Sequence, residues 1–329
     1  ILGRGSRAMK FYNSLCPALQ NEIIETKAKL IEGNVYLDFE SVQDLLNDRF
    51  YLDRNENWLI YTTPTDLIKS QIGTGTYDIS GAENVMPYLI SVVKDDKVYV
   101  ALEYVKQYTN FSYELYTDPN RIQLRTEWGA RTTATVKKES SVRYRAGVKS
   151  PILRDVEVGE ELVILEELEN WVKVKTPDAM MGYIETKYLS TQMSDEEIPV
   201  SDYVEPEYTN LVRDHKINLG WHAIYTAAGN DTFDEVTSNV GSLNVIAPTW
   251  FSLTDNNGNY TSFASSAYVQ KAHGRNIEVW PLLDNFNTEV STLEIMSYTS
   301  KRQALVDRLI NDLLACGADG INLDFEQIP

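Results

Sequence analysis

The order of apolar and polar residues changes along the chain and predicts three kinds of folded segment. Between residues 34 and 125, short runs alternate apolar and polar side chains, a pattern typical of half-buried strands. We expect strands at residues 35–39, 58–62, 97–102 and 121–124, with short helices at 67–71 and 103–109. This mixture predicts a small α+β domain, which we assign to residues 33–126.

Residues 131–190 carry further short alternating runs, separated by turn residues. The expected strands are 133–136, 142–144, 161–165, 171–175 and 182–184. Short strands at close spacing predict a small all-β barrel. Residues 191–209 follow, and their first 18 positions hold six acidic residues, two prolines and no Lys or Arg. We expect an extended, solvated linker there.

From residue 210 to residue 329, strand-like and helix-like runs take turns. The expected strands are 217–221, 243–247, 277–283 and 320–325, and the expected helices are 232–240, 262–273 and 301–316. The last helix carries an apolar stripe formed by Leu305, Leu309 and Leu313 and, beside them, Val306, Ile310 and Leu314. Strand–helix alternation predicts parallel βαβ units, here the first half of a (β/α)8 TIM barrel, which typically needs ~250 residues. We therefore expect that the chain is a fragment of a longer protein, or that the missing half comes from elsewhere. The fold class is multidomain.

The charge balance limits the possible partners. Forty-eight acidic residues against 30 basic ones give a net charge of −18, which argues against binding a nucleic-acid backbone. No apolar run approaches the ~18 residues of a membrane span, and no signal segment is visible at the start. Cys16 and Cys316 are interpreted as unpaired small hydrophobic residues. The three histidines all lie beyond residue 210. We expect no metal and no cofactor, and the oligomeric state stays open.

Residues 319–326 hold the strongest candidate chemistry. In the run Asp-Gly-Ile-Asn-Leu-Asp-Phe-Glu, an extended strand would place Asn322, Asp324 and Glu326 on one face. Polar side chains on an apolar strand are costly unless they line a site, and catalytic groups of β/α barrels lie at the carboxyl ends of strands. The alternative is a buried strand that ends at a solvated loop.

Asp319, Gly320, Asp324 and Glu326 follow the D-G-x-x-x-D-x-E pattern, and the segment resembles glycoside hydrolase family 18, which includes chitinases. The resemblance implies that Glu326 is the general acid and later the base. Asp324 would orient the substrate's own 2-acetamido group, which attacks the sugar carbon and leads to a retained configuration. Two carboxylates this close would raise the pKa of the acid. Asn322 replaces the usual Asp, which points to the spore-germination and cortex-type peptidoglycan hydrolases.

Further candidates lie near the ends of the other expected strands. Aromatic rings that could stack on sugars belong to Trp221, Tyr225, Trp250, Phe251 and Trp280. We take the three tryptophans as substrate-binding residues, although any one such ring alone is more often a core residue. Asp284 is a candidate for hydrogen bonds to the substrate, and Asn285 is a weaker one.

The first two domains also resemble known families. Residues 33–126 resemble the copper amine oxidase N-terminal-like domain, but they contain no His or Cys cluster, so we assign no copper and expect a role in spacing or attachment. Residues 131–190 resemble a bacterial SH3 domain, on the strength of Gly159, Trp171, the Gly182-Tyr183 pair and Tyr188. That resemblance implies anchoring to the cell wall.

Together these features predict a secreted or wall-associated glycosidase of the Gram-positive type. Its substrate would be an N-acetylglucosamine-containing glycan, either peptidoglycan or a chitin-like polymer. The alternative is a non-catalytic carbohydrate- or wall-binding protein, although inactive relatives in the family usually lose the acid, and Glu326 is present. Because half a barrel lacks part of the site, we expect this 329-residue chain to be inactive by itself.

Overall fold

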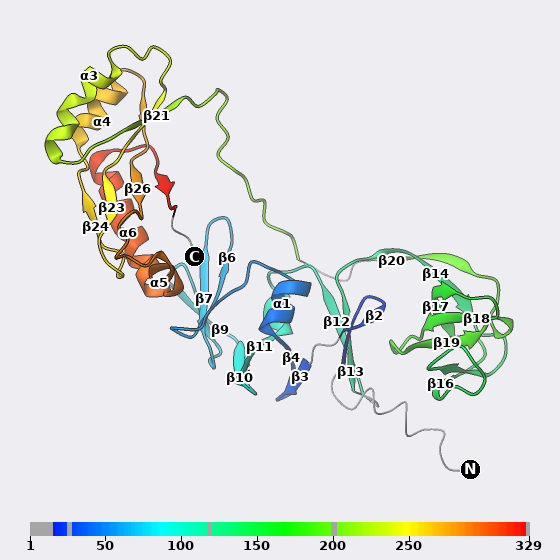
Figure 1. Cartoon of the computed structure of the whole chain (residues 1–329). Helices are drawn as coiled ribbons and strands as arrows, with labels where there is room; N and C mark the ends of the chain where they lie inside the picture. Colours follow the sequence, from blue (N-terminus) through cyan, green and yellow to red (C-terminus); the bar gives the residue numbers. More distant parts are fainter. Residues whose placement is uncertain (1–15, 25–27, 118–119, 199–202, 327–329) are drawn as a thin grey trace. The chain divides into compact units, whose positions relative to one another are not determined.

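The computed structural model describes residues 16–24, 28–117, 120–198 and 203–326 (Figure 1). The chain divides into two compact units. One consists of Ile1–Leu52 and Leu59–Tyr208, and the other of Asp53–Trp58 and Thr209–Pro329. The first unit is rich in strands, and the second alternates strands with helices, as the sequence pattern predicts.

Three sheets and two short helices form the amino-terminal part of the first unit. One sheet has the order β10-β11-β4-β3, a second β5-β6-β7-β8-β9 and a third β12-β13-β1-β2. Their strands are β1 (Cys16–Leu19), β2 (Glu22–Ile23), β3 (Ala28–Ile31), β4 (Asn34–Asp38), β5 (Tyr51–Asp53), β6 (Trp58–Thr62), β7 (Leu67–Gln71), β8 (Thr76–Ile79), β9 (Ala82–Val85), β10 (Ser91–Lys94), β11 (Lys97–Ala101), β12 (Ser112–Tyr116) and β13 (Arg121–Arg125). The helices are α1 (Phe39–Leu45) and α2 (Leu102–Val105).

The strands predicted for this part are confirmed to within about one residue at each end, but the two predicted helices are not both found. Residues 67–71 form strand β7, because Ile68 and Ser70 are buried in alternation and the strand pairs with β8. The helix predicted at 103–109 is shorter and begins one residue earlier, as α2. Helix α1 was not predicted from the sequence, and it is capped by Asp38, which accepts hydrogen bonds from the backbone N–H and the hydroxyl of Ser41.

A seven-stranded sheet of order β16-β15-β19-β18-β17-β14-β20 makes up the rest of the first unit. Its strands are β14 (Gly129–Thr135), β15 (Ser140–Arg143), β16 (Ile152–Val156), β17 (Glu161–Glu167), β18 (Trp171–Lys175), β19 (Met181–Glu185) and β20 (Met193–Glu197), with the 3-10 turn η2 (Thr186–Tyr188) before the last. The all-β prediction is confirmed, and β16 and β20 are additional. Its small core contains Val142, Leu162, Val174 and Ile184.

The acidic segment is not the free linker that its composition suggests. Its residues 193–197 are strand β20, which pairs antiparallel with β14, and Asp195 accepts from the guanidinium of Arg131 at 2.6 Å. Farther on, the Tyr208 hydroxyl donates to the backbone oxygen of Thr62, and the guanidinium carbon of Arg49 lies 3.6 Å from the centre of the Tyr208 ring. Residues 193–197 are extended and mostly exposed, as expected for a solvated segment, but they are not a free spacer because they pair with a strand edge.

The second unit contains a half-barrel sheet. Strand β21 (Leu219–His222) pairs in parallel with β22 (Val245–Pro248), which pairs with β25 (Glu278–Val279), and β23 (Phe251–Leu253) pairs with β26 (Leu282–Asp284), which pairs with β27 (Asn322–Asp324). The short β24 (Tyr260–Ser262) lies antiparallel to β23. The four predicted strand regions therefore lie side by side in sequence order. Between them are η3 (Ala227–Thr232), α3 (Phe233–Thr237), α4 (Ser266–His273), α5 (Thr292–Ser297) and α6 (Thr299–Cys316), as Figure 1 shows.

Helix α6 packs on this sheet with only one of its two apolar rows. Leu305 and Leu309 are buried, whereas the row of Val306, Ile310 and Leu314 is exposed, with Leu314 at 76%. The helix ends at Gly317, whose φ of +77° lies in the left-handed region, and its N–H donates to the carbonyl of Leu313. This turn leads the chain directly into the segment before β27.

Candidate active site

The register of the parallel strands brings three polar side chains into one row. Ser252 of β23 is paired with Asp284 of β26, and Asp284 is paired with Asp324 of β27. Paired residues in neighbouring parallel strands point to the same face. The Ser252 hydroxyl donates to Asp284 Oδ1 at 2.8 Å. Asn322 lies two residues before Asp324 and therefore shares its face.

The three members of the row differ in how they are held. Asp284 is only 8% exposed, and it also accepts from the backbone N–H of Phe286 at 3.1 Å. No hydrogen bond to the carboxylate of Asp324, or to that of Glu326 beyond the row, is formed by another residue that the structure describes. Asp284 is thus held in place as an acceptor of two hydrogen bonds.

Glu326 lies just beyond the carboxyl end of β27, and its backbone is tethered by a buried amide. Its N–H donates to Asn285 Oδ1 at 3.0 Å, and Asn285 Nδ2 donates to the hydroxyl of Thr292 at 2.8 Å. Asn285 is fully buried. Both ends of its amide are engaged, so it positions Glu326 and is not available to hydrogen-bond a substrate, contrary to the sequence interpretation. The side chain of Glu326 is exposed.

The three predicted tryptophans lie in three different environments. Trp221 is 68% exposed at the end of β21 and can present a ring face. Trp280 is half-buried, and its indole N–H donates to Glu278 at 2.9 Å. Trp250 is fully buried and donates to Asn230 Oδ1 at 2.8 Å. Its ring has no free face, so the structure places Trp250 in the core and removes it from the substrate-binding candidates.

The first two residues of the motif support the backbone. Asp319 Oδ2 accepts from the backbone N–H of Val279 at 2.8 Å and lies 2.8 Å from His273 Nε2. Gly320 packs against Trp280, because a Cβ at this position would lie 3.2 Å from Trp280 Cδ1. These contacts give Asp319 and Gly320 structural roles at the start of the motif segment.

Two residues near this edge of the sheet were missed by the sequence analysis. Ser252 continues the polar row of Asp284 and Asp324. His222 is the last residue of β21, and its ring nitrogens lie 2.8 Å from the Tyr268 hydroxyl and 3.0 Å from the Thr232 hydroxyl. Burial lowers the pKa of His222, so the neutral imidazole is favoured. Both are polar residues within or just after an apolar strand, and that signal could have identified them.

The described ranges of the chain hold no cluster of three or more His, Cys, Asp or Glu side chains suited to a metal ion. None of their helices is both long and apolar enough to cross a membrane. Cys316 is a buried free cysteine whose pKa is raised by burial, while the side chain of Cys16 lies outside the described residues.

Comparison with known proteins identifies one domain. Residues 139–190 match the family described as bacterial SH3 domain. These residues form a bacterial SH3 domain. No curated protein matches the chain.

Two solved structures are similar to parts of the chain. A chitinase from Chromobacterium violaceum is 20% identical with a TM-score of 0.26, over 33% of this chain and 35% of its own. NlpC2 from Trichomonas vaginalis is 11% identical with a TM-score of 0.18, over 43% of this chain and 46% of its own. The chain thus spans about a third of the chitinase and less than half of NlpC2. At these TM-scores neither similarity carries an argument about activity.

Proposed function

We propose that this protein is a cell-wall glycosidase of the family 18 type, acting on N-acetylglucosamine-containing glycan. The observation that carries the proposal is the placement of Asp324 and Glu326. Asp324 lies in a polar row with Ser252 and Asp284, and Glu326 follows at the strand's carboxyl end with its backbone held by Asn285. Catalytic groups of β/α barrels lie at this end of the strands.

In the proposed mechanism, Glu326 protonates the glycosidic oxygen as the bond to the leaving sugar breaks. The 2-acetamido oxygen of the substrate attacks the sugar carbon, and Asp324 accepts a hydrogen bond from the acetamido N–H, which directs that attack. Glu326 then removes a proton from the water that opens the intermediate. Asn322 contributes hydrogen bonds but no charge. Because Asn at this position resembles the spore-germination and cortex-type peptidoglycan hydrolases, peptidoglycan is favoured as the substrate over ordinary chitin.

The appended domains support a place on or outside the cell wall. A bacterial SH3 domain is suited to hold an enzyme to wall polymer, and the seven-stranded sheet provides it. Residues 33–126 would act as a spacer or attachment domain of the copper amine oxidase N-terminal-like type, without copper.

The test compares the full-length gene product with its Glu326→Gln variant on purified peptidoglycan. The amide keeps the shape but cannot donate the proton, so we expect release of reducing ends to fall by roughly 10²–10⁴-fold, while binding to the glycan persists. Glu289→Gln is the matched control, because Glu289 is an exposed glutamate on the loop after β26. Equal turnover by wild type and Glu326→Gln would remove Glu326 from the mechanism. Binding without turnover by the wild type would favour a non-catalytic wall-binding protein.

A further inference from the structure

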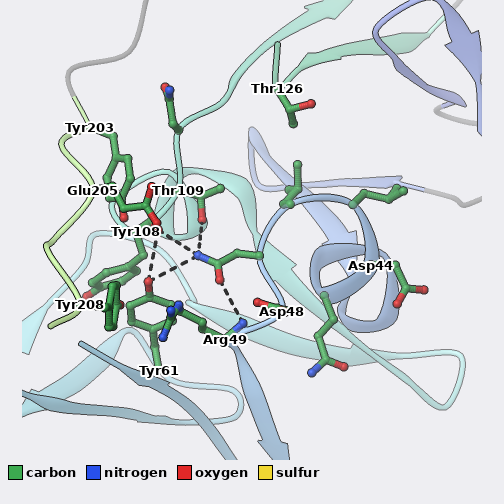
Figure 2. A pocket seen from close by; sticks show the side chains of 15 residues that line it. Asp44, Asp48, Arg49, Tyr61, Tyr108, Thr109, Thr126, Tyr203, Glu205 and Tyr208 are labelled. Carbon is green, nitrogen blue, oxygen red and sulfur yellow. Dashed lines mark hydrogen bonds between the residues drawn. The ribbon is translucent and has the colours of Figure 1, made fainter. Parts of the chain in front are cut away.

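A well-defined cavity in the described part of the first unit has no assigned role. It has a volume of about 490 Å³ and lies between the loop after α1, the turn after α2 and the segment 203–208 (Figure 2). Its volume falls in the range of ~300–1,000 Å³ that small-molecule sites occupy. In Figure 2, Tyr203, Glu205 and Tyr208 come from one side and Asp44 of α1 from the other.

Tyrosine rings line much of this cavity. Tyr61 and Tyr108 have ring centres 4.6 Å apart, and both pack against the fully buried Phe50. Tyr203 and Tyr208 are half-buried against the same region. Burial raises the pKa of Tyr108 to about 12, so its hydroxyl stays protonated. Such rings offer both an apolar face and a hydrogen-bonding tip.

The wall on the α1 side is rigidly built. Asn47 Nδ2 donates to the backbone oxygen of Tyr108 and to the Thr109 hydroxyl, both at 2.9 Å, and Asn47 Oδ1 accepts from the N–H of Arg49 at 3.0 Å. These bonds, drawn as dashed lines in Figure 2, fix the loop that carries Asp48. A site that is ordered before binding loses less entropy when a ligand enters.

The residues that line the cavity carry more negative than positive charge. Asp44, Asp48 and Glu205 contribute three carboxylates, and within the described ranges no Lys, Arg or His nitrogen lies within ion-pair distance of them. The one cation, Arg49, is already stacked on the Tyr208 ring. An anionic ligand would be repelled, while hydroxyl groups could donate charge-assisted hydrogen bonds to the three carboxylates.

We propose that this cavity binds an uncharged saccharide. The hydroxyl groups of the sugar would donate to Asp48 and Glu205, and its C–H faces would pack on the tyrosine rings. The cavity lies in the first unit and Glu326 in the second, so this inference goes beyond the proposed hydrolysis and stands if that proposal fails. It makes the amino-terminal part of the protein a glycan-holding site separate from the SH3 domain.

The test is calorimetric titration of the whole chain with a soluble, uncharged N-acetylglucosamine oligomer. Every protein carries Glu326→Gln so that the probe is not cleaved. We expect Glu205→Gln to weaken binding roughly tenfold, since a charge-assisted hydrogen bond becomes a neutral one. Glu207→Gln is the matched control from the same segment, because Glu207 is exposed and does not line the cavity. Asp48→Asn should act in the same direction as Glu205→Gln.

Three outcomes would overturn the proposal. One is no binding of the uncharged oligomer by the parent chain. Another is equal binding by Glu205→Gln and Glu207→Gln, which would place the oligomer elsewhere on the molecule. The third is binding of the cationic, de-N-acetylated oligomer alone, which would make the cavity a cation site. The Glu205→Gln comparison reports on the cavity alone, whereas turnover reports on Glu326, so failures of the two proposals are distinguishable.

Discussion

Replacing Asn285 with alanine tests whether the buried amide holds the motif strand in place. The change removes the acceptor for the Glu326 N–H and the donor to the Thr292 hydroxyl. A buried polar group left unsatisfied costs about 1–3 kcal/mol. Glu326 is exposed, so water can reach its N–H and reduce that share of the cost, whereas Thr292 is buried. We therefore expect a loss of about 2–3 kcal/mol in the free energy of unfolding of the second unit.

A second variant separates the two hydrogen bonds. Thr292→Val keeps the shape of the side chain but removes the hydroxyl that accepts from Asn285 Nδ2, and we expect this loss to cost about 1–3 kcal/mol. Because the Asn285–Thr292 bond can be lost only once, the double variant should cost less than the sum of the two single variants. Asn287→Ala is the control, since Asn287 lies two residues later and caps only the N–H of the exposed Glu289.

The assay is urea unfolding followed by hydrogen-exchange mass spectrometry, which reports the second unit separately from the first. Peptides that cover β26 and β27 should lose protection at lower urea in Asn285→Ala than in the wild type. Unfolding of Asn285→Ala and Asn287→Ala at the same urea concentration would show that the Asn285 amide does not stabilise the unit. Strictly additive losses in the free energy of unfolding for Thr292→Val and Asn285→Ala would show that the two side chains are independent.

Three further predictions concern the same unit. Trp250→Ala should destabilise this unit by about 3–5 kcal/mol because the ring is fully buried. Trp221→Ala removes an exposed ring and should change the free energy of unfolding by less than about 0.5 kcal/mol. Urea denaturation checks both. Burial lowers the pKa of His222 below its ordinary 6.5, so the unfolded chain binds a proton that the folded chain resists. Stability should therefore fall as the pH drops below about 6.5, by at most ~1.4 kcal/mol per pH unit, and His222→Gln should flatten the profile measured by thermal unfolding. Finally, de-N-acetylated glycan lacks the internal nucleophile, so the full-length gene product should hydrolyse it far more slowly than the acetylated polymer. The product of the acetylated polymer should retain the anomeric configuration, as followed by NMR. Comparable rates on the two polymers would contradict the substrate-assisted scheme.

Much of the element order could be predicted from the sequence because strands and helices have different periods. The alternation of 58–62 and 171–175 predicted strands that the structure contains, and the i, i+4 spacing of Leu305 and Leu309 predicted a helix. The same rule placed Asn322 and Asp324 on one face. Residues 67–71 were wrongly predicted as a helix, because five residues are too few to separate the two periods and the pairing with β8 decides the outcome.

Burial and hydrogen-bond partners depended on segments far apart in the chain. Trp221 and Trp250 are the same residue type near strand ends, yet one is exposed and the other is in the core. Strand β20 formed from acidic residues because β14 and Arg131 lie beside it.

The geometry of the candidate site likewise depends partly on the local sequence and partly on the tertiary structure. The sequence alone determined that Asn322 and Asp324 lie on one face of a strand, because that depends only on the two-residue period of the backbone. Only the tertiary structure decided that Ser252 and Asp284 continue the row and that Asn285 tethers Glu326. The reason is that strand register and the packing of α5 bring together residues more than 30 positions apart, and no local pattern records which of them will meet.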